Sequence, residues 1–456
     1  MMKRKVLVTV LAVLSIAGTA PADFIAHDPG VRGGAPGAGG MLAALTATQG
    51  EFFTAGKADF EEEEVLADGL GPRFNLDSCA GCHTQPAVGG TSPALNPQVA
   101  VATAFGARNT VPSFIAPDGP VREARFKRNP DGTPDGGVHA LFVISGRNDG
   151  SADAGGCTIR QDNFERQLAN NNVIFRIPTP TFGAGLIEQI PDAAILANQR
   201  TDVSAKAALG IGGHPNLIRI TGEGNNNGND GTVARFGWKA QNKSLLLFSG
   251  EAYNVEMGIT NELFQTERDE TPSCQFAPTP NDVTNTDGAT GIDTISAIEK
   301  FAFFMRFLAA PEPSATTPGG APSIGRGRAT FTATGCALCH TPALQTGNST
   351  VAALSNKTVN LFSDVLLHNM GPGLADEVSQ GQAAGDEFRT APLWGLGQRV
   401  FFLHDGRTSN LIVAIRAHKS YGNATFKASE ANAVVDRFNA LNEFQKQDLL
   451  NFLRSL

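Results

Sequence analysis

Apolar and polar residues alternate in short groups along this chain, and Gly, Pro and Asn interrupt most of these groups. Residues 41–53 and 326–332 favour short helices, whereas residues 140–145 and 217–221 have strand-like character. Near the end of the chain, leucines recur at helical spacing, at positions 449, 450, 453 and 456. The pattern predicts a mainly α-helical protein with long loops, a few short strands and an amphipathic C-terminal helix.

The first 22 residues follow a different pattern. Three cations at positions 3–5 precede an apolar run over residues 6–17, and Ala-Pro-Ala follows at positions 20–22. A basic start, an apolar centre and an A-x-A sequence are typical of a secretory signal peptide. We therefore expect residues 1–22 to be removed and the mature protein to act in a bacterial periplasm or outside the cell.

The composition indicates a globular protein and argues against nucleic-acid binding. A length of 456 residues favours two or three domains, and 41% apolar residues are enough to build a sizeable core. The net charge is -8, and no dense block of Lys and Arg follows position 5, so nucleic acid is a poor partner. No later stretch has the roughly 18 consecutive apolar residues of a spanning helix, so we expect no membrane span in the mature chain.

Four of the six cysteines belong to two C-x-x-C-H motifs. The motifs are Cys79, Cys82 and His83, and Cys336, Cys339 and His340. On one helical turn, residues three apart share a face, so both thiols can add to the vinyl groups of one haem while the histidine reaches its iron. We therefore predict two covalently bound c-type haems with these histidines as iron ligands. Disulfides or zinc knuckles are the alternative, but zinc knuckles usually need a second such motif nearby.

The two remaining cysteines are Cys157 and Cys274. In an oxidising compartment two leftover thiols most often pair, and a disulfide that closes so long a loop stabilises the fold by about 4 to 5 kcal/mol in the chain-entropy model. We expect a structural disulfide. A redox-active dithiol that exchanges electrons with a substrate, or two unpaired thiols, are the alternatives.

A run rich in proline and glycine separates the two haem motifs. Residues 311–322 contain the best candidate for a linker, because Pro and Gly disfavour regular structure there. The expected organisation is an N-terminal haem domain over residues 23–310, a linker over residues 311–323 and a C-terminal haem domain over residues 324–456.

The two halves also resemble each other outside the haem motifs. Residues 176–185 parallel residues 389–397, and residues 236–245 parallel residues 403–411. These parallels predict two c-type cytochrome domains that arose by internal duplication, with a large insertion in the first copy.

Seven stretches of the chain resemble one protein family. They are FNLDSCAGCHTQPAVGG, FRIPTPTFGAGLIEQIPD, RFGWKAQ, AYNVEMGITNELF, LFSDVLLHNMGPGLAD, EFRTAPLWGLG and FLHDGRTSNL. Over residues 50–456 the chain is similar to bacterial di-haem oxidoreductases, which are related to di-haem cytochrome c peroxidases. The resemblance implies an exported di-haem c-type enzyme with peroxidase-like chemistry and electron transfer between two covalent haems.

The resemblance also implies a second ligand for the second haem. Peroxidase relatives place a distal ligand or redox residue fourteen positions after the His of an H-D-G motif, and counted from His404 that position is His418. The second iron would then bind both His340 and His418. The alternative is that His418 is an ordinary surface histidine.

Two further residues match functional positions of the relatives. Trp238 stands where they keep a Trp between the haems in a W-D-G-R motif, although Lys-Ala-Gln follows it here. Glu256, in Glu-Met-Gly, stands where they have a distal-pocket acid. Phe248 stands where their companion Gln would fall, which predicts slow turnover of peroxide. The alternative for Trp238 is a core tryptophan.

The first haem has no obvious second ligand. No His follows its motif at the short spacing of classical relatives, so this iron is either open to substrate or bound by His139. His368 is expected beside a site or at a domain interface. Residues 225–231 have the character of a calcium loop, and relatives bind calcium between domains; a plain solvated loop is the alternative.

The leading interpretation is an oxidoreductase whose first haem does the chemistry and whose second haem receives or stores electrons. An open iron beside a carboxylate can bind peroxide, whereas an iron with two His ligands has no site for substrate. The expected partners are a small redox protein and a small substrate, peroxide or thiol. The alternatives are a pure electron-transfer cytochrome and an enzyme that acts on thiols or other sulfur compounds through Cys157 and Cys274.

Overall fold

The computed structural model describes residues 24–149, 154–218 and 232–456. Helices make up 33% and strands 11%, so the protein is mainly helical with long loops, as predicted. The α-helices are α1 (Ala47–Glu61), α2 (Cys79–Cys82), α3 (Gln98–Val101), α4 (Phe164–Ala169), α5 (Ala184–Glu188), α6 (Asp192–Gln199), α7 (Val203–Leu209), α8 (Leu245–Met257), α9 (Gly291–Thr294), α10 (Ala297–Phe307), α11 (Ala321–Thr334), α12 (Leu411–Ala417), α13 (Asn432–Ala440) and α14 (Glu443–Ser455). The predicted signal peptide lies outside the described residues.

The strands form small antiparallel sheets that fasten loops to one another. They are β1 (Arg73–Phe74), β2 (Glu123–Phe126), β3 (Val138–His139), β4 (Phe142–Val143), β5 (Val173–Arg176), β6 (Asn216–Ile218), β7 (Thr232–Ala234), β8 (Leu344–Gln345), β9 (Thr358–Val359), β10 (Leu367–Asn369) and β11 (Glu387–Arg389). One sheet has three strands in the order β3-β2-β5. The other sheets have two strands each and are β1-β4, β6-β7, β8-β9 and β10-β11. Strands also occur in the second half, where the sequence did not predict them, because runs of two or three residues are too short to show an alternating pattern.

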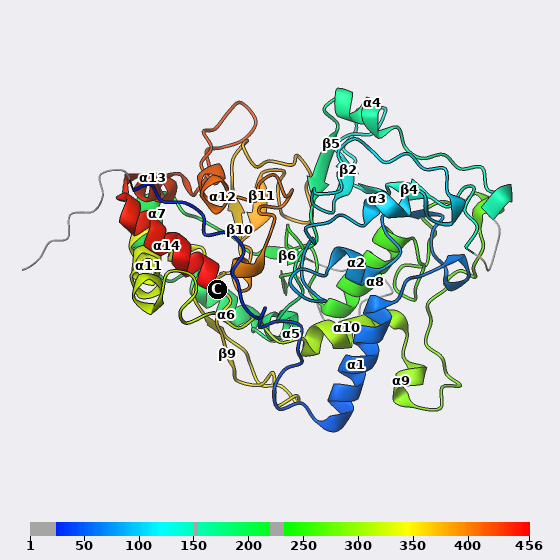
Figure 1. Cartoon of the computed structure of the whole chain (residues 1–456), viewed down its shortest axis with the longest axis horizontal. Coiled ribbons are helices and arrows are strands. Elements are labelled where there is room, and N and C mark those ends of the chain that lie inside the picture. Colours follow the sequence, from blue (N-terminus) through cyan, green and yellow to red (C-terminus); the bar gives the residue numbers. More distant parts are fainter. Residues whose placement is uncertain (1–23, 150–153, 219–231) are drawn as a thin grey trace, which may run out of the picture.

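Helices gather in two groups (Figure 1). In one group, which we call the first lobe, α1, α8 and α10 pack together; in the other, the second lobe, α11 packs on α14 and α13. Buried aromatic side chains fill both lobes: the first core includes Phe60, Phe301 and Phe304, and the second includes Phe331 and Phe452. Each lobe therefore has its own apolar core.

The second lobe contains segments from before the predicted linker. The side-chain amide of Asn198, on α6, donates to the hydroxyl of Thr341 at 3.1 Å, and α7 packs on α13. The first described residues also run beside α14 (Figure 1), where Asp28 accepts hydrogen bonds from the Arg454 guanidinium at 2.7 Å. Residues from both halves of the sequence thus build this lobe.

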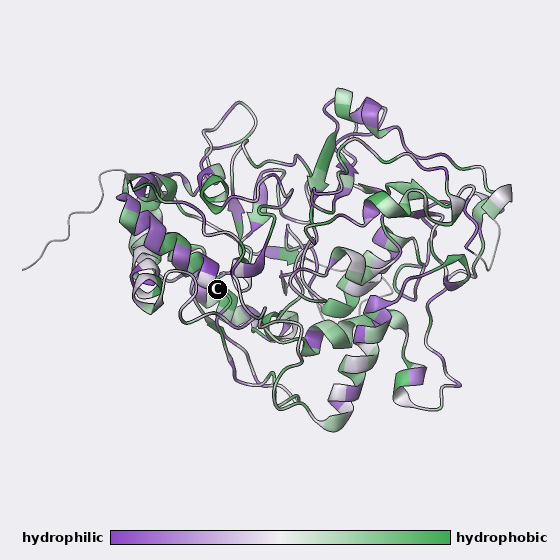
Figure 2. Ribbon diagram, in the orientation of Figure 1, coloured by the Kyte–Doolittle hydropathy of each residue, from purple (hydrophilic) through white to green (hydrophobic). Residues whose placement is uncertain are grey.

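Helix ends account for the differences from the predicted boundaries. The first helix begins at Ala47 rather than residue 41, because Thr46 forms a capping box with Gln49. Helix α11 begins at Ala321, inside the predicted linker, because the first turn of a helix tolerates Pro322. The C-terminal helix is confirmed as α14, and Figure 2 shows hydrophilic and hydrophobic residues alternating along it.

The predicted strand segments are present in shortened form. Of residues 140–145 only Phe142–Val143 form a strand, β4, which pairs with β1. Of residues 217–221, the first two belong to β6 and the rest lie outside the described residues.

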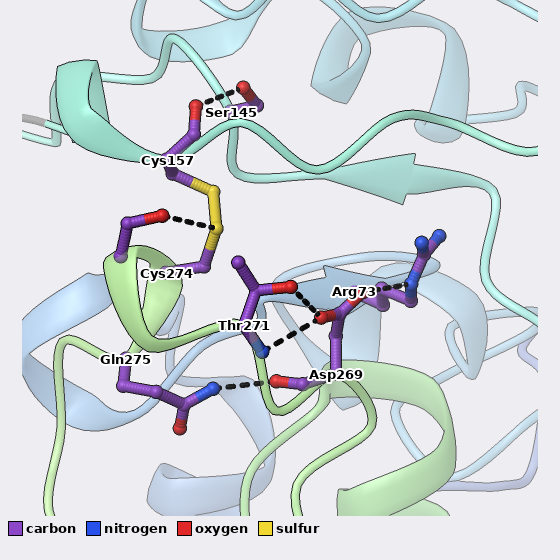
Figure 3. The surroundings of a disulfide bond; sticks show 8 residues. Arg73, Ser145, Cys157, Asp269, Thr271, Cys274 and Gln275 are labelled. Atoms are coloured by element: carbon purple, nitrogen blue, oxygen red, sulfur yellow. Dashed lines mark hydrogen bonds and ion pairs between the residues drawn. A yellow bond between two sulfur atoms is a disulfide. The ribbon is translucent and has the colours of Figure 1, made fainter.

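The expected disulfide between Cys157 and Cys274 is confirmed (Figure 3). Both cysteines are buried, and the bond joins positions 117 residues apart. The hydroxyl of Ser145 donates to the carbonyl of Cys157 at 2.6 Å. Because loop-closing cross-links restrict the unfolded chain, this bond stabilises the irregular region of the first lobe.

Close helix contacts support the segment before each C-x-x-C-H motif. A Cβ at Gly56, on α1, would overlap the backbone carbonyl of Lys300 on α10, and a Cβ at Gly327, on α11, would overlap that of Asp448 on α14. Glycine is therefore required at both crossings, where the two backbones are in contact.

We expect Gly327→Ala to lower the free energy of unfolding by about 1 to 3 kcal/mol, because the added methyl group has no space and the helices must separate. Gly325→Ala is the matched control: it lies on the exposed side of the same helix with open space around it. There alanine should stabilise the protein by about 0.5 to 1 kcal/mol, as it does at most helical glycines. Urea unfolding of the two variants checks this, and changes of the same sign would contradict the packing argument.

Candidate haem sites

The first C-x-x-C-H motif lies on the wall of a cavity of about 160 Å³. Helix α2 is a single turn that holds Cys79 and Cys82, and the backbone N–H of His83 donates to the carbonyl of Cys79 at 3.0 Å. Both thiols and the imidazole line this cavity. The motif thus has the one-turn geometry that its spacing predicts.

The imidazole of His83 is held in one tautomer. Its Nδ1 lies 2.9 Å from the carbonyl oxygen of Gly90 and donates its proton there. Burial lowers the pKa of His83, so the ring is neutral at pH 7. A neutral ring with its proton on Nδ1 leaves the Nε2 lone pair free, which is the form that binds a metal ion.

Glu256 lines the same cavity from near the end of α8. One of its carboxyl oxygens accepts a hydrogen bond from the side-chain amide of Asn75 at 2.6 Å. Burial, and then the nearby carboxylate of Glu123, raise the pKa of Glu256 well above its usual range. The raised pKa favours the protonated form of Glu256, which can donate a proton.

Glu123, which the sequence analysis did not identify, completes an acidic pair with Glu256. It lies on β2 and forms an ion pair of 2.6 Å with Arg125 on the same strand. Burial raises the pKa of Glu123, but the charge of Arg125, the hydrogen bond with Glu256 and the charge of Arg176 together outweigh this, and the net pKa is lowered. A charged carboxylate thus lies beside a neutral one. One sequence signal could have identified Glu123: it lies two positions before Arg125, and opposite charges at this spacing point to the same face of a strand.

The second C-x-x-C-H motif lines a separate cavity of about 230 Å³. Cys336 begins a short 3-10 turn, and the backbone N–H of His340 donates to the carbonyl of Cys336 at 2.9 Å. Cys339, His340 and His418 also line this cavity. The structure therefore brings His418 to the second motif, as the resemblance implied.

His340 and His418, two of the four histidines of the described residues that line the second cavity, are in the tautomer seen at His83. Nδ1 of His340 lies 3.0 Å from the carbonyl of Phe362, and Nδ1 of His418 lies 2.8 Å from the carbonyl of Ala414, one turn earlier on α12. Burial, and then the proximity of His418, lower the pKa of His340 to about 4. Burial also lowers the pKa of His418. Two neutral imidazoles with free Nε2 atoms thus line one cavity.

Trp238 lines both cavities. Its indole N–H donates to the carbonyl of Ile177 at 2.9 Å, and its own carbonyl accepts from the backbone N–H of Arg389 at 2.9 Å. The side chain is therefore fixed between the two motifs. This is the position that the resemblance implied for a tryptophan between the haems.

The residues after Trp238 explain the departure from W-D-G-R. Lys239 is buried and forms an ion pair with Asp376 at 3.0 Å, while Gln241 lines the first cavity. Phe248 also lines this cavity. An amide side chain is thus present there, although it comes from position 241 instead of 248.

His139 and His368 have other partners for their ring nitrogens. Both nitrogens of His139 lie about 3 Å from carboxylates, at 2.9 Å from Asp135 and 3.0 Å from Asp162. Among the described residues that line the first cavity, His83 is the only histidine. The geometry thus favours an open first site over ligation by His139.

His368 lines the second cavity, but its ring is occupied by acids. Nε2 lies 3.0 Å from Asp364 and Nδ1 lies 2.7 Å from Glu430. Burial lowers the pKa of His368, but the interactions with Cys339 and then Asp364 raise it, and the net pKa lies well above its usual value. A charged imidazolium cannot bind iron, which agrees with the expectation that His368 lies beside the site.

The calcium hypothesis at residues 225–231 lies outside the described residues. Elsewhere in residues 24–149, 154–218 and 232–456, no cluster of three or more His, Cys, Asp or Glu side chains could hold a metal ion. Within the same residues, no helix is long and apolar enough to cross a membrane.

Comparison with solved structures finds similar chains of low identity. A hydrazine synthase from Kuenenia stuttgartiensis is 12% identical over 100% of both chains, with a TM-score of 0.34. The diheme peroxidase BthA from Burkholderia thailandensis is 15% identical over 49% of this chain and 65% of that chain, with a TM-score of 0.29. A MauG-like protein associated with microbial copper homeostasis is 14% identical over 61% of this chain and 89% of that chain, with a TM-score of 0.28. No curated protein matches the sequence.

The family assignment rests on a match at the level of sequence. The family described as "Di-haem oxidoreductase, putative peroxidase" matches residues 125–456, which are most of the chain. The matched region begins after the first C-x-x-C-H motif and includes the second motif, Trp238, Glu256 and His418. With two motif-lined cavities and this match together, the chain belongs to the di-haem oxidoreductase family.

Proposed function

We propose that this protein is an exported c-type peroxidase in which the first cavity receives peroxide and the second cavity stores electrons. One observation carries the proposal: each cavity is lined by a C-x-x-C-H motif, but among the described residues His83 is the only histidine of the first cavity, whereas the second also has His418 with Nε2 free. The first cavity instead has the protonated carboxyl group of Glu256. A reactive iron needs a free position for substrate, whereas an electron-storing iron can have two histidine ligands. The two cavities differ in this way.

The residues present fit two covalent haems. In each motif the two thiols and the histidine line one cavity, and each histidine keeps Nε2 free. Cys79, Cys82, Cys336 and Cys339 form no disulfide, so their thiols are available to the vinyl groups. His83 would hold one haem, and His340 with His418 the other. When bound, haem supplies the iron that accepts peroxide and exchanges electrons.

Glu256 supplies the proton chemistry of the first cavity. Cleavage of the O–O bond of peroxide needs a proton moved from one oxygen to the other, and a carboxyl group within reach can carry it. Glu123, which is charged and adjacent, can hold that proton in between. Asn75 keeps the Glu256 carboxyl group in place through its hydrogen bond.

Trp238 is proposed as the electron relay between the two cavities. Its indole ring borders both cavities and is fixed by the hydrogen bond to Ile177. A small redox protein would supply electrons from outside. The sulfur-compound alternative receives no support, because the buried Cys157–Cys274 disulfide lines neither cavity.

We also propose that the two lobes arose by duplication. In the first, a Cβ at Gly185 would overlap the carbonyl of Arg306; in the second, a Cβ at Gly397 would overlap that of Arg454. These glycines belong to the segments that run parallel in sequence. Together with the crossings of α1 with α10 and of α11 with α14, the contacts support one ancestral helix arrangement in both lobes.

Haem should remain attached after denaturation, because each thioether is covalent. Replacement of both cysteines of one motif by serine should halve the haem content per protein, and replacement of all four should abolish it. Haem staining of denaturing gels and haem quantitation check this. Release of all haem from the wild-type protein by acid–acetone extraction would rule out c-type attachment.

His418→Ala should change the second haem alone. With the second imidazole removed, one low-spin signal in the EPR spectrum of the oxidised protein should become high-spin, and the reduced protein should bind carbon monoxide at that haem. His139→Ala is the matched control and should leave both signals unchanged, because the ring of His139 faces two carboxylates. An unchanged spectrum for His418→Ala would refute the assignment.

Glu256→Gln should slow the reaction with peroxide by about a hundred- to ten-thousand-fold, because the amide cannot transfer the proton. The haem spectra should stay nearly intact, since glutamine keeps the shape of the side chain. Rapid-mixing absorption spectra measure the rate. If wild type and variant both fail to react, the protein is an electron carrier and the proposed function is wrong.

Trp238→Phe provides the complementary variant for the same measurement. It should leave the first reaction with peroxide unchanged but slow the later oxidation of the second haem. Equal rates of that later oxidation in wild type and variant would exclude the indole as a relay.

A further inference from the structure

Two arginines on the wall of the second cavity have no carboxylate partner. The side chains of Arg389 and Arg399 are only 8% and 9% exposed. No acid of the described residues forms an ion pair with either one, whereas several buried arginines are paired, such as Arg176 with Asp376 and Arg454 with Asp28.

Their hydrogen bonds in the protein are few and neutral. Arg389 donates from Nε to the carbonyl of Gly237 at 2.9 Å and from Nη1 to the carbonyl of Thr390 at 3.4 Å. Arg399 donates from Nη2 to the carbonyl of Pro392 at 3.2 Å. Nη2 of Arg389, and Nε and Nη1 of Arg399, have no acceptor among the described residues. Because both side chains line the second cavity, these donors are available to a molecule inside it.

The two charges are costly without an anion. Burial lowers the pKa of both side chains to about 10, and the charge of Arg399 adds to the effect on Arg389. Both remain charged at neutral pH. Removing a cation from water costs several kcal/mol unless a counter-charge compensates for it. Two uncompensated cations therefore indicate a ligand with two negative charges.

The position of the pair identifies the ligand. Arg389 and Arg399 share the second cavity with Cys336, Cys339 and His340. They also line a small adjoining cavity together with Trp238. A haem attached through the two thiols carries two propionate groups, whose carboxylates match the number and sign of the guanidinium charges.

We propose that Arg389 and Arg399 bind the propionate carboxylates of the second haem and thereby set its reduction potential. The proposal rests on the proposed presence of a haem in the second cavity. Guanidinium groups form two parallel hydrogen bonds with a carboxylate, so the pair would also fix the orientation of the haem relative to Trp238. A cation near the iron favours the reduced form, because reduction lowers the positive charge there.

The test is a spectroelectrochemical titration of the holoprotein. In Arg389→Gln and in Arg399→Gln, the equilibrium of the second haem should move toward the oxidised form by about ten-fold or more, because one propionate loses its counter-charge. The first haem is the internal control and should not change. The propionate bands of the second haem in the resonance Raman spectrum should shift in the same variants.

Two further variants guard against indirect effects. Arg326→Gln, which removes an exposed arginine of α11, should leave both potentials and the Raman bands unchanged. Arg399→Lys keeps the charge but loses the forked geometry, so it should shift the Raman bands with a smaller change of potential. The lysine variant also supplies a result if a glutamine variant fails to fold.

The outcomes separate the two proposals. A second haem that is present by haem stain but shows no change of potential or Raman bands would overturn the propionate assignment alone. A shift that depends on the concentration of added phosphate would assign the pair to a free anion instead, and would also overturn it. Absence of the second haem from the wild-type protein would instead refute the proposed function.

Discussion

One hydrogen bond recurs at His83, His340 and His418, and the chemistry of both cavities depends on it. In each case Nδ1 donates to a backbone carbonyl. This contact fixes the ring, selects the tautomer and leaves Nε2 as the free nitrogen. Because burial also keeps these rings neutral, the lone pair is not lost to a proton. Backbone geometry thus prepares the donors before any iron is present.

The same low-polarity surroundings act in opposite directions on acids and bases. They keep the imidazoles neutral, and they also keep Glu256 protonated beside the charged Glu123. A buried site therefore stores a proton at one group while it withholds protons from another. The two cavities differ in the residues that accompany the motif: Glu256 lines the first and His418 lines the second. In the proposed function, this difference separates a reactive site from a closed one.

Structure within a few consecutive residues could be predicted from the sequence, whereas contacts between residues far apart in the chain could not. The C-x-x-C-H motifs are complete within five residues, so their one-turn geometry followed from spacing alone. His418, Trp238 and Glu256 could be identified only through family resemblance, because no local rule connects them to a cysteine motif. Glu123 stayed hidden, since a charged residue on a short strand is usually exposed.

The arrangement of the lobes was equally hard to infer. The linker prediction divided the chain by composition, but α6 packs beside Thr341 across that division. The hydrophobic pattern of α6 predicts which of its faces is buried, but it does not predict which element packs on that face.

The contact between Asp28 and Arg454 places a limit on the timing of folding. The two residues are 426 positions apart, so the contact forms only when two segments far apart in the chain come together. Helix α14 also supplies Leu449 and Leu453 to the wall of the second cavity. This wall is complete only after α14 has docked, and such long-range closure is slow. Until then, the thiols of Cys336 and Cys339 lie in a pocket with one side still open.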